Sequence, residues 1–256
     1  MTDHVLTEKE VQISCKTCNA DLLGSYCAQC GQKNLATRFT LRSVITDAVV
    51  QFLSLDRGLV HTVVSLIRKP GEVVQQYVSG KTILFSNPFR YFLLWITVAQ
   101  LIALWSGAME DFAEGFANGG GDEIDANRFI SFWTTYYVLG LAGSFPFLVL
   151  GTYVFFLRSE RNIAEHAIFH LFLSGQFALY VALALIVLGT LGDKVGFVAT
   201  VIALVAGITG VMRASSQFFN VGKFKAIVFT PLALGMAWIV YGGAILLTLK
   251  FIFSMF

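Results

Sequence analysis

Long apolar runs without a central charge dominate the sequence from about residue 89 onward. A helix needs roughly 20 residues to cross a bilayer core of about 30 Å. A charged side chain at its centre costs about 2.5–3.5 kcal/mol on insertion scales. Strands of a membrane barrel would instead alternate apolar and polar residues. The sequence therefore predicts an all-α membrane protein, a bundle of about five transmembrane helices. The expected spans are about 89–106, 132–157, 167–191, 195–212 and 226–253.

Composition excludes an ordinary soluble domain and a disordered chain. Hydrophobic residues make up 56% of the 256 residues and charged residues only 13%, and 24 residues are Phe. A soluble domain has about 25% charged residues, and a globule of this size could not bury so much apolar surface. We expect no secretory signal peptide, because the first residues are polar and form no apolar segment.

Lysines and arginines predict the orientation of the spans. Ten of the 18 lie at or before Arg90, and the second and fourth interspan loops add five more. The opposite side has three, at Arg128, Lys194 and Lys250. The positive-inside rule then places the N-terminus in the cytoplasm and, with five spans, the C-terminus outside. If the short fourth span were re-entrant, the C-terminus would lie inside.

Four cysteines form the strongest local motif, Cys15-x-x-Cys18 followed after eight residues by Cys27-x-x-Cys30. Two such turns direct four thiolates to one point, which is typical of a structural zinc site. Asn19 and Gly31 follow the second cysteine of each pair and readily adopt the left-handed conformation of a metal knuckle. Zinc would supply the folding energy of so small a segment. All four ligands come from the chain, which argues against catalysis.

Other readings of the cysteines are weaker. Disulfides would need an oxidising compartment, iron–sulfur clusters use other spacings, and no βαβ context for a redox pair is present. The segment has Lys16 and Lys33 against Asp21, with Tyr26 as its only aromatic residue. This is no basic patch, so we expect no nucleic-acid partner. A protein contact, or simple capping of the N-terminal region, is favoured.

The chain divides into a zinc-ribbon-like segment (1–35), juxtamembrane amphipathic helices (36–88) and the helical bundle (89–256). Thr40 can cap a helix over 41–55, and shorter helices are expected at 59–67 and 72–78. These helices lie on the membrane surface, or they pack on the spans or on each other. Both arrangements bury the same faces.

Glu165, His166 and His170 lie together at the start of the third span. The two histidines are four residues apart and share a helix face, so they could bind one metal. Packing is the favoured interpretation, with proton handling or a second metal as alternatives. Arg158, Arg161 and Arg213 are expected at the same membrane face as topology determinants and lipid contacts. Ala203, Gly207 and Gly210 form a small-residue stripe that could support a homo-oligomer.

The motif pattern resembles an uncharacterised family of bacterial integral membrane proteins, known only as a domain of unknown function, with an N-terminal zinc ribbon. The sequence departs from that pattern at Thr82 and Phe85. The resemblance implies the architecture and a bacterial inner membrane as the location, and it implies no activity. The residues that carry it are Cys15, Cys18, Cys27, Cys30-Gly31-Gln32, Asp47, Leu55-Asp56-Arg57-Gly58, Thr62, Pro70-Gly71, Tyr77, Gly80-Lys81, Asn87-Pro88-Phe89, Glu165-His166 and His170.

The sequence favours a non-enzymatic interaction or scaffold module in a lipid bilayer, with Zn²⁺ as structural cofactor and a cytoplasmic or membrane protein partner. Transport or lipid handling is the first alternative, because Pro146 and Pro231 interrupt two spans. A metal-dependent membrane enzyme using Glu165, His166 and His170 is the second.

Overall fold

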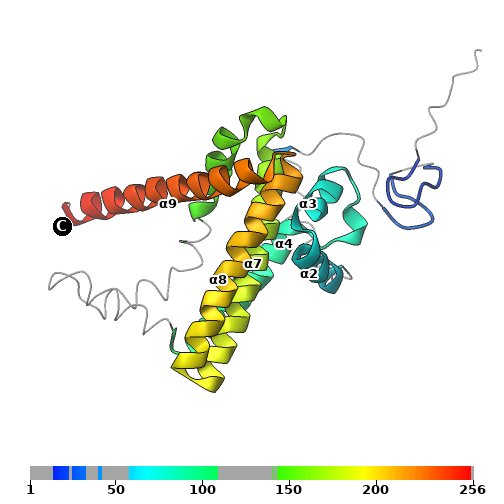
Figure 1. The fold of residues 1–256 in the computed structure, drawn as a ribbon. Helices are drawn as coiled ribbons and strands as arrows, with labels where there is room; N and C mark the ends of the chain where they lie inside the picture. Colours follow the sequence, from blue (N-terminus) through cyan, green and yellow to red (C-terminus); the bar gives the residue numbers. More distant parts are fainter. Residues whose placement is uncertain are drawn as a thin grey trace, which may run out of the picture.

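The computed structural model describes residues 14–22, 25–32, 40–41, 58–108, 140 and 143–254 (Figure 1). Within them, secondary structure is helical apart from isolated bridges in the cysteine segment, such as Ser14 with Asp21. This confirms the predicted all-α class. The helices are α2 (Leu59–Arg68), α3 (Pro70–Val78), α4 (Pro88–Trp105), α7 (Ile163–Leu191), α8 (Asp193–Phe218) and α9 (Lys223–Ser254), with 3-10 turns η1 (Thr82–Leu84) and η2 (Leu157–Ser159). A further apolar helix covers Gly143–Phe155.

Among the described residues, four helical segments are long and apolar enough to cross a membrane: Thr82–Trp105, Ile163–Leu191, Asp193–Phe218 and Lys223–Ala244. The fourth expected span was the shortest in sequence, yet α8 has 26 residues and rises about 39 Å at 1.5 Å per residue. Helix α8 is therefore long enough to cross completely. The second expected span lies partly outside the described residues, and its described part is the shorter helix Gly143–Phe155.

The helices α4, α7 and α8 form the centre of the bundle. Helices α7 and α8 form an antiparallel hairpin, which Gly192 closes with a positive φ of 80°. Helix α4 runs parallel to α7, since Trp105 at its end packs near Gly189. Figure 1 shows α2 and α3 on one side of these helices, and α9 diverging from them on the other.

Aromatic side chains fill the core near the start of α7. Phe169 stacks on Phe218 with ring centroids 5.4 Å apart, and Tyr77 meets Phe172 edge-on at 5.3 Å. The hydroxyl of Tyr91 donates to Oε1 of Gln176, which joins α4 to α7. This core connects α3, α4, α7 and α8.

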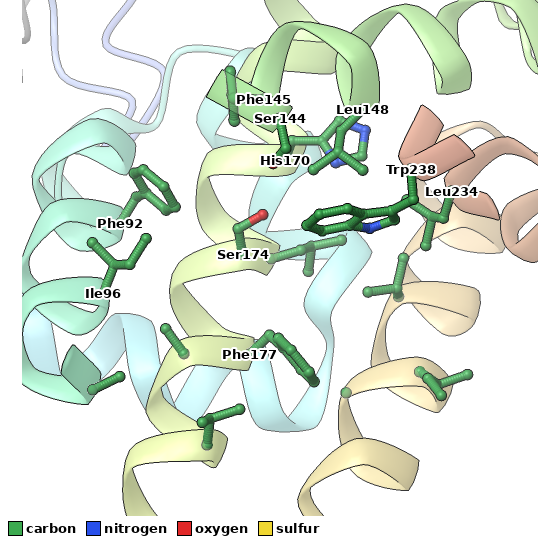
Figure 2. Close-up of a pocket in the computed structure, with 17 residues that line it drawn as sticks. Phe92, Ile96, Ser144, Phe145, Leu148, His170, Ser174, Phe177, Leu234 and Trp238 are labelled. Atoms are coloured by element: carbon green, nitrogen blue, oxygen red, sulfur yellow. The ribbon is translucent and has the colours of Figure 1, made fainter. Parts of the chain in front are cut away.

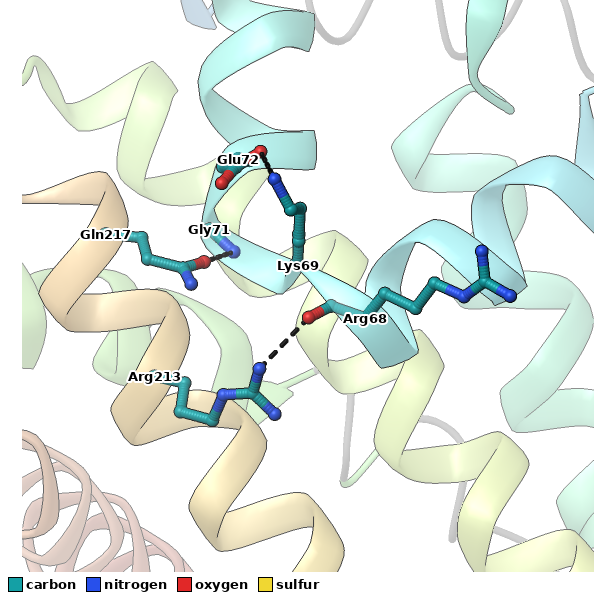
Figure 3. Close-up of polar contacts among 6 residues, drawn as sticks. All are labelled: Arg68, Lys69, Gly71, Glu72, Arg213 and Gln217. Carbon is teal, nitrogen blue, oxygen red and sulfur yellow. Dashed lines mark hydrogen bonds and ion pairs between the residues drawn. The ribbon is translucent and has the colours of Figure 1, made fainter.

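Two side chains of α8 hold the corner between α2 and α3 (Figure 3). The Arg213 guanidinium donates to the carbonyl oxygen of Arg68 at 3.0 Å, and Gln217 Oε1 accepts from the Gly71 N–H at 2.8 Å. The approach requires glycine, because a Cβ on Gly71 would lie 2.6 Å from the carbonyl oxygen of Ala214. From the sequence, Arg213 was expected to determine topology and contact lipid. The structure adds a hydrogen bond from Arg213 that caps the end of α2.

The two juxtamembrane helices differ in how they are buried. Helix α3 buries Val73, Val74 and Tyr77 against the bundle, which is the packing alternative raised by the sequence. Helix α2 buries Thr62 and Leu66, while Val60, Val64 and Ile67 on its outer face are exposed. The expected helix over 41–55 lies outside the described residues except for Leu41.

Two residues of the small-residue stripe of α8 serve contacts inside this chain. Ala203 and Gly207 are buried, and a Cβ on Gly207 would lie 2.2 Å from the Phe177 ring of α7. Gly207 therefore permits the close approach of α7 and α8.

Candidate metal centre

The cysteine segment consists of two similar knuckles, offset by 12 residues in the sequence. In the first, the Cys15 N–H donates to the Ala20 carbonyl at 2.7 Å and the Asn19 N–H donates back to Cys15 at 2.9 Å. In the second, Cys27 donates to Gln32 at 2.8 Å and Gly31 donates to Cys27 at 2.8 Å.

The turn residues have the predicted left-handed conformation. Asn19 has φ of 60° and Gly31 has φ of 74°. Asparagine and glycine are the residue types that adopt this conformation at low cost. The local sequence therefore specifies both knuckles.

The four thiols converge with spacings that suit a tetrahedral metal. Their Sγ atoms all lie within 4.8 Å of one another. The Sγ atoms are 3.6 Å apart for Cys15 and Cys30, and 3.5 Å apart for Cys18 and Cys27. Four sulfurs at the usual Zn–S distance of about 2.3 Å would be about 3.8 Å apart. The cysteines are free, and these separations far exceed the roughly 2.05 Å of a disulfide bond.

Backbone donors and thiol neighbours shift the cysteine pKa values in opposite directions. The N–H groups of Cys18 and Thr17 lower the pKa of Cys15 to about 6. Cys30 accepts from the Gln32 N–H, but desolvation and the neighbouring thiols outweigh that donor and raise its pKa to about 12. Four thiols this close cannot all ionise without a cation between them. Cys15, Cys18, Cys27 and Cys30 thus fit a divalent metal, which would favour all four thiolates.

Gln32 connects the second knuckle to the helical body. Its side chain is only 2% exposed. The amide nitrogen donates to Thr82 Oγ1 at 2.9 Å, and Oε1 accepts from the Ile83 N–H at 2.9 Å and from Thr17 Oγ1 at 3.2 Å. The carbonyl of Gln32 also completes the Cys27 turn. Gln32 therefore both completes the second knuckle and attaches that knuckle to residues Thr82 and Ile83.

We call Gly80–Leu84 the docking loop. Gly80 has φ of 102°, and a Cβ there would lie 3.0 Å from Cδ of Lys16. A Cβ on Gly31 would lie 3.4 Å from Cδ1 of Ile83. The loop is fixed to α2 in turn, since His61 Nδ1 lies 2.9 Å from the carbonyl oxygen of Leu84.

Helix α4 begins at Pro88, four residues after the end of this loop. Ser86 N–H donates to Thr62 Oγ1 at 2.8 Å. Asn87 caps α4 by accepting from Phe89 N–H at 3.0 Å, with Pro88 in the first turn. The docking loop is thus held between α2 and a well-capped membrane helix.

The structure places Glu165, His166 and His170 in a packed setting. Glu165 closes a capping box with Asn162 at the start of α7. Thr152 Oγ1 lies 3.1 Å from Nδ1 of His166 and 2.9 Å from Nε2 of His170. His166 also stacks on Phe219. In the part of the chain that the structure describes, the four cysteines form the group of His, Cys, Asp or Glu side chains that could hold a metal.

Arg161 has a local role beside these residues. Its guanidinium donates to the Phe218 carbonyl at 3.3 Å and lies 4.5 Å from the centre of that ring. Its Nη1 lies 3.9 Å from Oε2 of Glu165. Arg161 therefore caps the end of α8 and joins it to the start of α7.

Comparison with known proteins finds a match in the region of the docking loop. Residues 56–99 match a family model described as a protein of unknown function, DUF3667. That match covers α2, α3, the docking loop and most of α4. No curated protein and no solved structure matches the chain.

Proposed function

We propose that this membrane protein binds one structural zinc ion at Cys15, Cys18, Cys27 and Cys30, and that the zinc-bound segment forms part of an interaction module on the cytoplasmic face. The buried Gln32 carries the proposal, because it ties the second knuckle to the docking loop through both ends of its amide. The four thiolates leave no ligand position for a substrate, which favours a structural role.

Exposed side chains beside the docked segment support a protein-binding role. Tyr26 projects from the second knuckle with 63% of its surface exposed, and Val60 on α2 is 75% exposed. Tyrosine and exposed apolar groups are common in protein interfaces. Arg68 in the last turn of α2 adds a positive charge, whereas the charge of Lys69 is paired with Glu72 at 3.0 Å.

Purification of the full chain from its native membrane tests this proposal. The test compares the wild type with the Cys27→Ser/Cys30→Ser variant, and it measures zinc and co-purifying proteins in both. We expect one zinc per chain and a stoichiometric partner, both lost in the variant. Tyr26→Ser should weaken the partner interaction while zinc is retained, and Gln29→Ala, at an exposed position of the same knuckle, should change neither. A zinc-loaded wild type without any partner would refute the interaction role.

A further inference from the structure

A cavity of about 320 Å³ lies between α4, α7, α8, α9 and the helix Gly143–Phe155 (Figure 2). Its walls are largely apolar and include Phe92 and Ile96 of α4, Phe177 of α7 and Trp238 of α9. Its described lining contains no lysine, arginine, aspartate or glutamate. Pockets of this size and lining bind predominantly apolar ligands.

Polar side chains of the cavity gather at one end. Ser144, His170 and Ser174 line that end, whereas Phe177 and Val181 continue the lining along α7. The polar end is the one nearer the start of α7 and Arg161. From His170 to Val181 the helix rises about 16 Å, roughly half of a bilayer core of about 30 Å. The cavity thus matches the depth of one leaflet.

The cavity opens to the outside of the bundle between α8 and α9. Ile208 and Trp238 line it and are 53% and 47% exposed. Figure 1 shows α9 diverging from α8. The neighbouring α8 residues Ile202 and Val205 are exposed and apolar, so this surface suits contact with lipid. Water is a poor occupant, because each buried water needs two to four polar partners.

We propose that this cavity holds one acyl chain of a membrane lipid. The lipid comes from the leaflet on the side of Arg161 and the start of α7. The ester end of the lipid points toward Ser144 and His170, and the methyl end toward Val181. An apolar chain replaces the dispersion contacts that an empty apolar space would lack. This site is independent of the cysteine segment and of its proposed role.

Photolabelling of the full chain in phospholipid vesicles tests the site. The probe is a phosphatidylglycerol with a photoreactive diazirine in one acyl chain, and mass spectrometry maps the adducts. We expect adducts at Ser174, Phe177 and Trp238. Ala178→Phe puts a ring into the cavity and should lower this labelling by about fivefold, corresponding to about 1 kcal/mol. Leu183→Phe, on an exposed position of the same helix, should leave it unchanged.

Several results would overturn the proposal. Adducts confined to outer residues such as Ile202 and Val205 would show only bulk lipid contact. The absence of adducts at Ser174, Phe177 and Trp238 would show that no lipid chain enters the cavity. If Ala178→Phe fails to fold, Ile96→Phe fills the cavity from the opposite wall, and undiminished labelling there would refute the acyl-chain site.

Discussion

Replacing Gly71 by alanine should detach the α2–α3 corner from α8. The added Cβ would lie 2.4 Å from Cβ of Gln217 and 2.6 Å from the carbonyl oxygen of Ala214. Overpacking of this kind costs about 1–3 kcal/mol, and the loss of the Gly71–Gln217 hydrogen bond costs about 0.5–1.5 kcal/mol. The better helix propensity of alanine recovers up to about 1 kcal/mol. The net local destabilisation is therefore about 2 kcal/mol.

Hydrogen exchange in detergent micelles measures this change directly. A loss of about 2 kcal/mol should speed amide exchange in α3 by about 30-fold, with little effect on the distant half of α7. Gly210→Ala is the matched control, because no described atom lies within 4 Å of its new Cβ, and it should not speed exchange. Unchanged protection of α3 in Gly71→Ala would refute the close packing of α3 on α8.

Three further predictions concern the cysteine segment and the bundle. Gln32→Ala should remove three hydrogen bonds of about 0.5–1.5 kcal/mol each. It should raise the protease sensitivity of residues 14–32 while zinc is retained. Equal protease sensitivity in Gln29→Ala would argue against specific docking. Zinc binding at pH 7 should release protons, because the raised pKa values of Cys18 and Cys30 keep these thiols protonated without metal. Affinity should then fall as the pH is lowered, and calorimetry in buffers of different ionisation enthalpy measures this; binding without proton release would contradict it. His166→Ala/His170→Ala should leave the zinc content unchanged, and loss of metal from that variant would revive the histidine site.

Local patterns were sufficient to predict the helical class and the knuckle geometry. Apolar runs in the sequence correspond to α4, α7, α8 and α9. Such helices can be predicted because their signal is local hydropathy and does not depend on long-range contacts. Asn19 and Gly31 adopt positive φ as expected, because these residue types adopt the left-handed conformation at low cost.

Contacts between distant segments could not be predicted from these patterns. Gln32 and Thr82 are 50 residues apart, and a glutamine after a cysteine knuckle gives no signal of its partner. Helical spacing placed His166 and His170 on one face, but it could not show that Thr152 of the preceding helix would contact both. For the same reason, the sequence could not predict that Arg213 would donate to the carbonyl of Arg68 and Arg161 to the carbonyl of Phe218.

X-ray absorption at the zinc edge of the purified full chain tests whether the four cysteines hold a structural zinc ion. We predict one zinc per chain with four sulfur neighbours at about 2.3 Å, and no such signal in Cys27→Ser/Cys30→Ser. A wild-type chain without zinc, or zinc bound by nitrogen and oxygen ligands, would contradict it.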